Sequence, residues 1–280
     1  MTNKKVVTLQ DISCVGQCSI TVAHPIISAC GVETIMIPSA VLSTHTGGFT
    51  GYTFRDLTDD IMPIMEHWQK ENLKFDCLYT GYLGSITQIG YVSELRKNVI
   101  KEDGLLIVDP AMADNGKLYY GFDDEFVKNM AGLCGKADII LPNITEACFM
   151  TGIPLDLENK TEEYIEKIID ALKALGAKKI VLKGIAFEKN KLGVAVYDSE
   201  TGELKYYFTE RMAKSYHGTG DCYAAAFTGA LMQGRTVFEA ASLAADFVVE
   251  SIRKTIDDDS HWYGVKFEQA LPLLVKELNR

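Results

Sequence analysis

The residues best suited to chemistry lie late in the chain, where the run from His217 to Cys222 (His-Gly-Thr-Gly-Asp-Cys) leads into an alanine-rich helical pattern. Glycines at alternate positions let backbone N–H groups turn towards one point, and a helix start adds its positive end, so the run favours binding an anion. Asp221, in the first helical turn, would lie beside that anion as a proton acceptor. The run is also compatible with a plain turn in which Asp221 only complements the helix dipole.

Charge and composition narrow the choice of partner. The chain has 28 basic and 38 acidic residues, a net charge of −10, which argues against nucleic acid or an anionic membrane and leaves a nucleotide possible. No apolar run reaches the ~18–20 residues of a membrane span, and the start lacks the pattern of a signal peptide. The seven cysteines include no C-x-x-C pair, which favours reduced thiols. We expect a soluble, cytoplasmic protein.

Short apolar runs typical of buried strands alternate with helical patterns along the chain. The strand-like runs are Val6–Leu9, Thr34–Ile37, Cys77–Tyr79, Leu105–Val108, Asp138–Leu141 and Lys179–Leu182. The helical patterns are Thr21–Ala29, Asp56–Glu71, Thr87–Lys101, Asp123–Leu133, a short one from Thr145, Thr161–Leu175, Asp221–Gln233, Thr236–Lys254 and Lys266–Leu278. This alternation predicts a three-layer, doubly wound α/β fold, a mostly parallel sheet with helices on both faces.

Two further strand patterns, Gly193–Tyr197 and Lys205–Thr209, flank a turn and predict a hairpin added to the sheet edge. No linker or repeat interrupts the chain, so we expect one domain over residues 1–280. Ligands bind such sheets at the carboxyl ends of the strands. Polar residues follow several of these ends, although glycine and asparagine also simply terminate strands; the candidates are Asp11, Thr46, Gly47, Tyr82, Asp109, Asn143, Glu146 and Lys183.

The Gly-Thr-Gly-Asp run before an alanine-rich helix resembles the ribokinase-like superfamily, and within it the chain resembles the vitamin B6 (pyridoxal, pyridoxine, pyridoxamine) kinases. The segments that carry the resemblance, in order, are Gln10–Ser13 with Gly16, Leu42–Gly47, Thr80–Ser85, Val108–Asp114, Pro142–Glu146 and Leu182-Lys183. Each is weak on its own, and their order along almost the whole chain makes the match specific.

The resemblance implies ATP-dependent phosphorylation of the 5′-hydroxymethyl group of a B6 vitamer, a reaction that depends on positioning and charge stabilisation. Asp221 would be the catalytic base, and the amides of Gly218, Thr219 and Gly220 would stabilise the transferred group. The vitamer side would consist of Asp11, Thr46, Gly47 and Tyr82, together with Asp221. His45 is expected to hold a loop by hydrogen bonds instead of acting as a base.

On the nucleotide side the resemblance implies ATP, Mg²⁺ and a homodimer, and it leaves a monovalent cation such as K⁺ open. The implied ATP-binding residues are Asp109, Asp114, Asn143, Glu146, Lys183 and Thr219. Glu146 and Asp109 would face the metal, and Lys183 the phosphates. Glu146 is also compatible with a helix-capping residue, and Lys183 with a solvated strand end. The stretch 114–122, with Gly116 and Gly121, is expected to be a flap over the phosphates.

The chain departs from the family pattern at three positions. Asp11 replaces the usual serine and would pair with a protonated pyridine nitrogen, which we expect to change the preference among vitamers. Ala113 replaces glycine at the flap hinge, and Leu42 replaces phenylalanine in the pocket wall.

Other functions remain open at this stage. The nearest is a hydroxymethylpyrimidine kinase, although that branch often has cysteine at the position of Asp221. A sugar kinase fits less well, because such chains are longer and have a separate β-lid. A non-catalytic binding protein on the same scaffold is a further alternative. A nicotinamide-dependent oxidoreductase is excluded, because Asp11–Cys18 contains only Gly16 instead of G-x-G-x-x-G.

Overall fold

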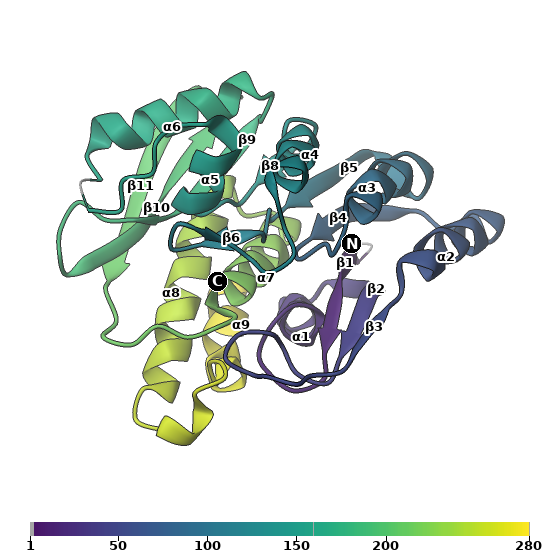
Figure 1. Ribbon diagram of the computed structural model, residues 1–280, viewed down its shortest axis with the longest axis horizontal. Helices are drawn as coiled ribbons and strands as arrows, with labels where there is room; N and C mark the ends of the chain where they lie inside the picture. The colour runs from purple at the N-terminus through teal and green to yellow at the C-terminus, as the bar shows by residue number, and fades with distance from the viewer. Residues whose placement is uncertain (1–2, 159, 280) are drawn as a thin grey trace.

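The computed structural model describes residues 3–158 and 160–279, and a nine-stranded sheet forms its centre (Figure 1). In spatial order the strands are β11 (Glu203–Glu210), β10 (Lys191–Asp198), β9 (Lys179–Ile185), β8 (Ile139–Ile140), β5 (Ile100–Val108), β4 (Phe75–Thr80), β1 (Lys5–Ser13), β2 (Glu33–Leu42) and β3 (Phe54–Asp56). Neighbours from β9 to β2 run parallel, whereas β10, β11 and β3 pair antiparallel at the two edges. The predicted doubly wound sheet and its edge hairpin are confirmed.

Helices cover both faces of the sheet because alternate strand residues feed two separate cores. Leu9 and Leu78 point into one core and Val6 and Tyr79 into the other. The first core is covered by α2 (Thr58–Lys70), α3 (Ile86–Asn98), α4 (Asp124–Cys134), α5 (Ile144–Thr151) and α6 (Glu162–Ala174). The second is covered by α1 (Ile20–Ala29), α7 (Thr219–Met232), α8 (Val237–Thr255) and α9 (Leu271–Leu278).

Two helix boundaries differ from the prediction by more than two residues. The helix expected at Thr87–Lys101 ends at Asn98, because β-branched Val99 and Ile100 lead into β5. The helix expected at Lys266–Leu278 is a 3₁₀ turn, Phe267–Gln269, followed by α9. Pro272 lies in the first turn of α9, where its missing N–H costs no hydrogen bond. A second 3₁₀ turn spans Asp259–His261.

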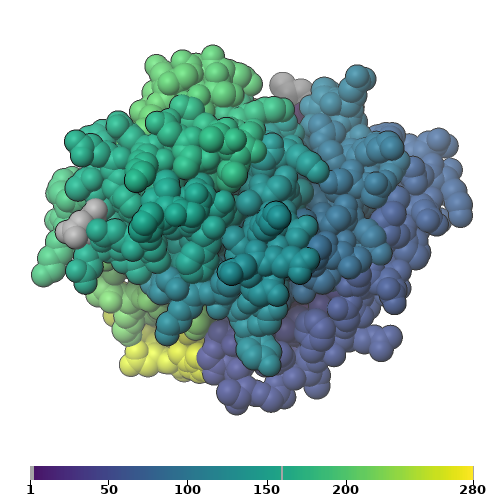
Figure 2. Space-filling model, turned by 45° about the horizontal axis from the view of Figure 1, so that its top comes forward, coloured from purple at the N-terminus to yellow at the C-terminus, as the bar shows by residue number. Residues whose placement is uncertain are grey.

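The alanine-rich sequence of α7 lets this helix pack closely against α1. A Cβ placed on Gly229 would lie 2.5 Å from Sγ of Cys30, so only glycine permits this approach. The close packing brings the start of α7 next to the residues that precede α1. The space-filling view shows the N-terminal part of the chain, in purple and blue, lying against the teal middle part (Figure 2).

A small hairpin follows β5 and is joined to the start of α5, because Asn143 donates to the carbonyl of Ala113 and Thr145 accepts from the N–H of Gly116. It pairs β6 (Ala113–Asp114) with β7 (Lys117–Leu118). Its turn contains Asn115 at φ 49° and Gly116 at φ 77°, which are the residue types that accept positive φ in a tight hairpin. Apart from Ala113, the hairpin falls in the stretch 114–122, for which a flap was predicted.

The described residues include no helix long and apolar enough to cross a membrane. All seven cysteines are free, as the sequence predicted.

Candidate active site

Asp221 lies in the first turn of α7, directly after the glycine-rich run. Gly218 precedes the helix with φ 76°, and a Cβ there would lie 1.6 Å from the backbone oxygen of Gln17. The position therefore requires glycine. The first N–H groups of a helix have no intrahelical partner, so those of Thr219, Gly220 and Asp221 are available to an anion. Thr219 fixes this start further, because its hydroxyl donates to the carbonyl of Tyr216 at 3.1 Å.

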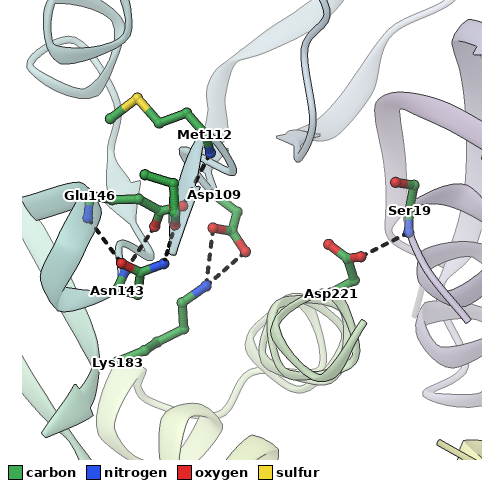
Figure 3. A network of polar contacts seen from close by, with 8 residues as sticks. Ser19, Asp109, Met112, Asn143, Glu146, Lys183 and Asp221 are labelled. Carbon is green, nitrogen blue, oxygen red and sulfur yellow. Dashed lines mark hydrogen bonds and ion pairs between the residues drawn. The ribbon is translucent and has the colours of Figure 1, made fainter. Parts of the chain in front are cut away.

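The carboxylate of Asp221 is half-buried and accepts a hydrogen bond from the backbone N–H of Ser19 at 3.0 Å (Figure 3). Burial raises the pKa of Asp221 to about 7, and the charges of the Asp109 and Asp11 carboxylates raise it as well. The hydrogen bond from the Ser19 amide acts in the opposite direction and lowers this pKa. A carboxylate with a pKa near neutrality can hold and release a proton at physiological pH.

Asp109 and Lys183 form an ion pair across the carboxyl ends of β5 and β9. Nζ of Lys183 lies 3.0 Å and 2.8 Å from the two carboxylate oxygens of Asp109. Burial opposes the charge of Lys183, but the carboxylates of Asp109 and Glu146 outweigh it and raise the pKa of the lysine. Lys183 thus stays a cation, and its Nζ lies 4.0 Å from the position of a Cβ on Gly220. The helix start of α7 and this cation therefore face the same space.

Asn143 and Glu146 form a capping box at the start of α5. The side chain of Asn143 accepts from the Glu146 N–H at 2.9 Å, and Glu146 accepts from the Asn143 N–H at 2.8 Å. The second oxygen of Glu146 accepts from the N–H of Met112 at 3.2 Å. The capping alternative for Glu146 is therefore what the structure shows. The residue is also buried, and burial together with the charge of Asp109 raises its pKa to about 8.

These residues line a cavity of about 800 Å³ that extends from the β6–β7 hairpin to α8. Of the residues predicted on the nucleotide and catalytic side, the cavity brings together Asp109, Asp114, Asn143, Glu146, Lys183, Gly218, Thr219, Gly220 and Asp221. The lining also includes apolar side chains, among them Leu192, Met212, Val248 and Ile252. The sequence did not single these out, because apolar side chains on a strand and a helix look like ordinary core.

Tyr119 is a further lining residue that the sequence analysis missed, although it lies within the predicted flap. Burial raises the pKa of its phenol, and the nearby carboxylates of Glu146, Asp114, Asp221 and Asp109 raise it further. The phenol therefore stays protonated and can donate a hydrogen bond to an anion in the cavity.

Asp11 lies at the end of β1, outside the lining of this cavity but linked to Asp221. Its carboxylate accepts from the hydroxyl of Ser19 at 2.6 Å and from that of Ser13 at 2.9 Å. The backbone N–H of the same Ser19 donates to Asp221. Tyr82 lies near Asp11. Burial is the main cause that raises the pKa of Tyr82 to about 12, and the negative charge of Asp11 contributes to the rise. On its other side Tyr82 stacks on Phe122, with ring centroids 5.5 Å apart.

The loop after β2 holds Thr46 and Gly47, which also lie outside the cavity lining. His45 is buried, accepts from the Gly47 N–H at 3.0 Å and lies 2.7 Å from the carbonyl of Tyr263 through Nε2. This pattern fits a neutral imidazole with its proton on Nε2, and burial lowers the pKa of His45. His45 therefore holds the loop by hydrogen bonds, as the sequence predicted. A Cβ on Gly47 would lie 2.5 Å from Nδ1 of His217, so the loop packs against the glycine-rich run.

The acidic residues of the site fit a cation only in combination with other ligands. The described residues contain no group of three or more His, Cys, Asp or Glu that could hold a metal ion by itself. Mg²⁺ usually keeps several waters and takes one or two carboxylates together with substrate phosphates. Asp109 and Glu146 both border the cavity, and their mutual repulsion contributes to the raised pKa of Glu146. A cation between them and a phosphate would relieve that repulsion.

Comparison with known proteins agrees with this geometry. A Bacteroides thetaiotaomicron protein solved in a crystal form with pyridoxal is 34% identical, with a TM-score of 0.91 over 98% of this chain and 96% of that one. The pyridoxal kinase of Lactobacillus plantarum is 30% identical, with a TM-score of 0.88 over 98% and 97%. A hydroxymethylpyrimidine/phosphomethylpyrimidine kinase of Staphylococcus aureus is 26% identical over 238 residues, 81% of this chain and 80% of that one.

The protein is therefore a kinase of the ribokinase-like class, a phosphotransferase that acts on an alcohol group. The family model described as phosphomethylpyrimidine kinase matches residues 26–265, and the chain belongs to that family.

Proposed function

We propose that this protein transfers the γ-phosphate of ATP to the 5′-hydroxymethyl group of pyridoxal, pyridoxine or pyridoxamine. The observation that carries the proposal is the location of Asp221 between two regions. On one side lies the cavity with the anion-binding start of α7, and on the other lies Asp11, joined to Asp221 through Ser19. A base in that position can reach a substrate hydroxyl and a phosphoryl group at once.

In this mechanism Asp221 accepts the hydroxyl proton as the substrate oxygen attacks the γ-phosphorus. The amides of Thr219 and Gly220, with Gly218 shaping the turn, stabilise charge on the transferred group, and Lys183 adds a positive charge close to Gly220. The phenol of Tyr119 donates to phosphate oxygens from the flap. The apolar side chains of the cavity lining, such as Val248 and Ile252, hold the adenine.

Asp109 and Glu146 would face Mg²⁺ on the nucleotide, with Asn143 and Asp114 beside them. When bound, that ion neutralises charge on the phosphates. Because both oxygens of Glu146 accept backbone N–H groups, we propose that it acts on the ion through water.

On the vitamer side, Asp11 would pair with the ring nitrogen, Tyr82 would pack on the ring, and Thr46 with Gly47 would contact the ring substituents. We further propose that residues 1–280 form one kinase domain and that the protein is a homodimer. We place it in the cytoplasm, because the free cysteines support a reducing compartment.

A second candidate is phosphorylation of hydroxymethylpyrimidine, which the family model and the S. aureus relative favour. Coupled ATP consumption with Mg²⁺, measured against the three B6 vitamers and hydroxymethylpyrimidine, separates the two. Turnover of a B6 vitamer supports the first proposal. Turnover of hydroxymethylpyrimidine alone refutes it in favour of the second, and binding of a vitamer without any turnover would indicate a binding protein.

A further inference from the structure

Ser19, the residue before α1, has a backbone conformation that serine rarely adopts. Its φ is 55° and its ψ is −134°. Elsewhere in the described chain, positive φ at residues other than glycine occurs at Asn72 and Asn115. Asparagine enters the left-handed helical region at little cost, but the ψ of Ser19 lies outside that region, and a residue with a Cβ adopts such a conformation only where the surrounding structure enforces it. Such conformations concentrate at functional sites.

Both polar hydrogens of Ser19 are directed at carboxylates. The backbone N–H donates to Oδ2 of Asp221 at 3.0 Å, and the hydroxyl donates to Oδ1 of Asp11 at 2.6 Å. A serine at this position normally caps the helix with its hydroxyl, yet Ser19 makes no such bond and is only 5% exposed. The N–H and the hydroxyl of Ser19 therefore serve the two carboxylates, while its carbonyl accepts from the N–H groups of Val22 and Ala23 in the first turn of α1.

We propose that Ser19 is a positioning residue for the phosphoryl transfer, an inference that rests on Asp221 being the base. Its backbone aims the amide at one oxygen of Asp221, as Figure 3 shows, and its hydroxyl ties Asp11 into the same unit. Ser19 thereby fixes the position of the Asp221 carboxylate, at the hydroxymethyl end of the substrate, relative to the Asp11 carboxylate, at the ring-nitrogen end. Through Ser19, proton transfer from the hydroxymethyl group to Asp221 depends on how the ring nitrogen binds at Asp11.

The bond from Ser19 also acts on the charge of Asp221. Burial is the largest influence on this carboxyl and raises its pKa, whereas the amide favours the ionised form. Several other ionisable groups face Asp221 from β1, β4, the residue after β5, β9, the segment after β7, the loop before α1 and α7 itself. They are Asp11, Tyr79, Asp109, Lys183, Tyr119, Cys18 and Cys222. These groups remain in Ser19 variants, so a change in the titration of Asp221 would report on the amide.

The test compares Ser19→Gly with Ser19→Ala. Glycine removes the hydroxyl and also lets the backbone relax, whereas alanine removes the hydroxyl and keeps the backbone constraint. For Ser19→Gly we expect kcat to fall about tenfold and the acid limb of kcat/KM to move up by about one pH unit, the effect of one hydrogen bond to a charged group. For Ser19→Ala we expect a raised KM for the vitamer with the acid limb unchanged. Asn72→Gly, which relaxes an exposed positive-φ residue away from the site, should leave both parameters unchanged.

A second measurement does not require turnover. The titration of Asp221 is followed by ¹³C NMR of labelled aspartate and assigned with Asp221→Asn; Ser19→Gly should raise its pKa and Ser19→Ala should not. The proposal would be overturned if Ser19→Gly kept both the kcat and the Asp221 pKa of the wild type. It would also be overturned if Asp221 titrated identically in the two variants, because the amide would then play no part. Failure of the proposed function looks different: wild type turns over no vitamer, while the titration difference persists.

Discussion

Lys183→Met removes the cation of the buried pair with Asp109 and keeps an unbranched side chain. The side chains of Lys183 and Asp109 are only 14% and 4% exposed, so water replaces the lost partner only in part. Breaking a buried pair in this way typically costs about 3–5 kcal/mol, and we expect a loss of that size in the free energy of unfolding at pH 8. Asp109→Leu with Lys183→Met should recover most of it, because no uncompensated charge remains.

The loss should depend on pH. Burial already raises the pKa of Asp109, and without Lys183 its folded-state pKa rises further above the unfolded value. Below its unfolded-state pKa, a carboxyl group of this kind does not change the free energy of unfolding. As the pH rises above that value, the group ionises in the unfolded state first, and the free energy of unfolding falls. Glu146, whose pKa Lys183 also lowers, acts in the same direction.

Urea denaturation at pH 5 and pH 8 measures this difference. Lys173→Met, which removes an exposed ion pair with Asp170, is the control and should cost less than about 1 kcal/mol at either pH. A Lys183→Met loss under about 1 kcal/mol at pH 8, or one equal at both pH values, would refute the reasoning.

Three further predictions concern the site. Gly218→Ala should abolish most activity, because Gly218 has a φ of 76° and its new Cβ would collide with the carbonyl of Gln17. The control is Gly234→Ala, which has a φ of 90° but nothing within 4 Å of the new Cβ, and it should lose some stability and keep activity. Equal activities in the two variants would contradict this role for Gly218. Asp11→Ser should change the ratios of kcat/KM among the three vitamers, and unchanged ratios would rule out a pairing of Asp11 with the ring nitrogen. Since the pKa of Asp221 is about 7 and the base must be ionised, kcat/KM should fall about tenfold per pH unit below that value; a flat profile down to pH 5 would exclude this carboxyl as the base.

Much of the fold could be predicted from the sequence because the signals are local. Runs such as Leu105–Val108 are apolar without alternation, which indicates strands buried on both faces, and the helical patterns between them imply parallel crossovers. The alanine-rich pattern after Asp221 likewise predicted a helix, and that helix, α7, lies against α1.

The contacts within the site depend on features that a sequence does not express locally. The pairing of Asp109 with Lys183 follows from the order of β5, β8 and β9 in the sheet. The role of Ser19 depends on a backbone torsion, and in the sequence a serine before an apolar run indicates only a helix cap. The two oxygens of Glu146 are engaged because the segment at Met112 folds over α5.

The central claim is that Asp221 is the base in the phosphorylation of a B6 vitamer. The most direct measurement is the initial rate of 5′-phosphate formation from pyridoxal, pyridoxine and pyridoxamine with ATP and Mg²⁺, for wild type and Asp221→Asn. The account predicts turnover of at least one vitamer and a fall of about 10²–10⁴-fold in kcat in the variant, the range for loss of general-base catalysis, with vitamer binding retained. Asp221→Asn with wild-type kcat would contradict it.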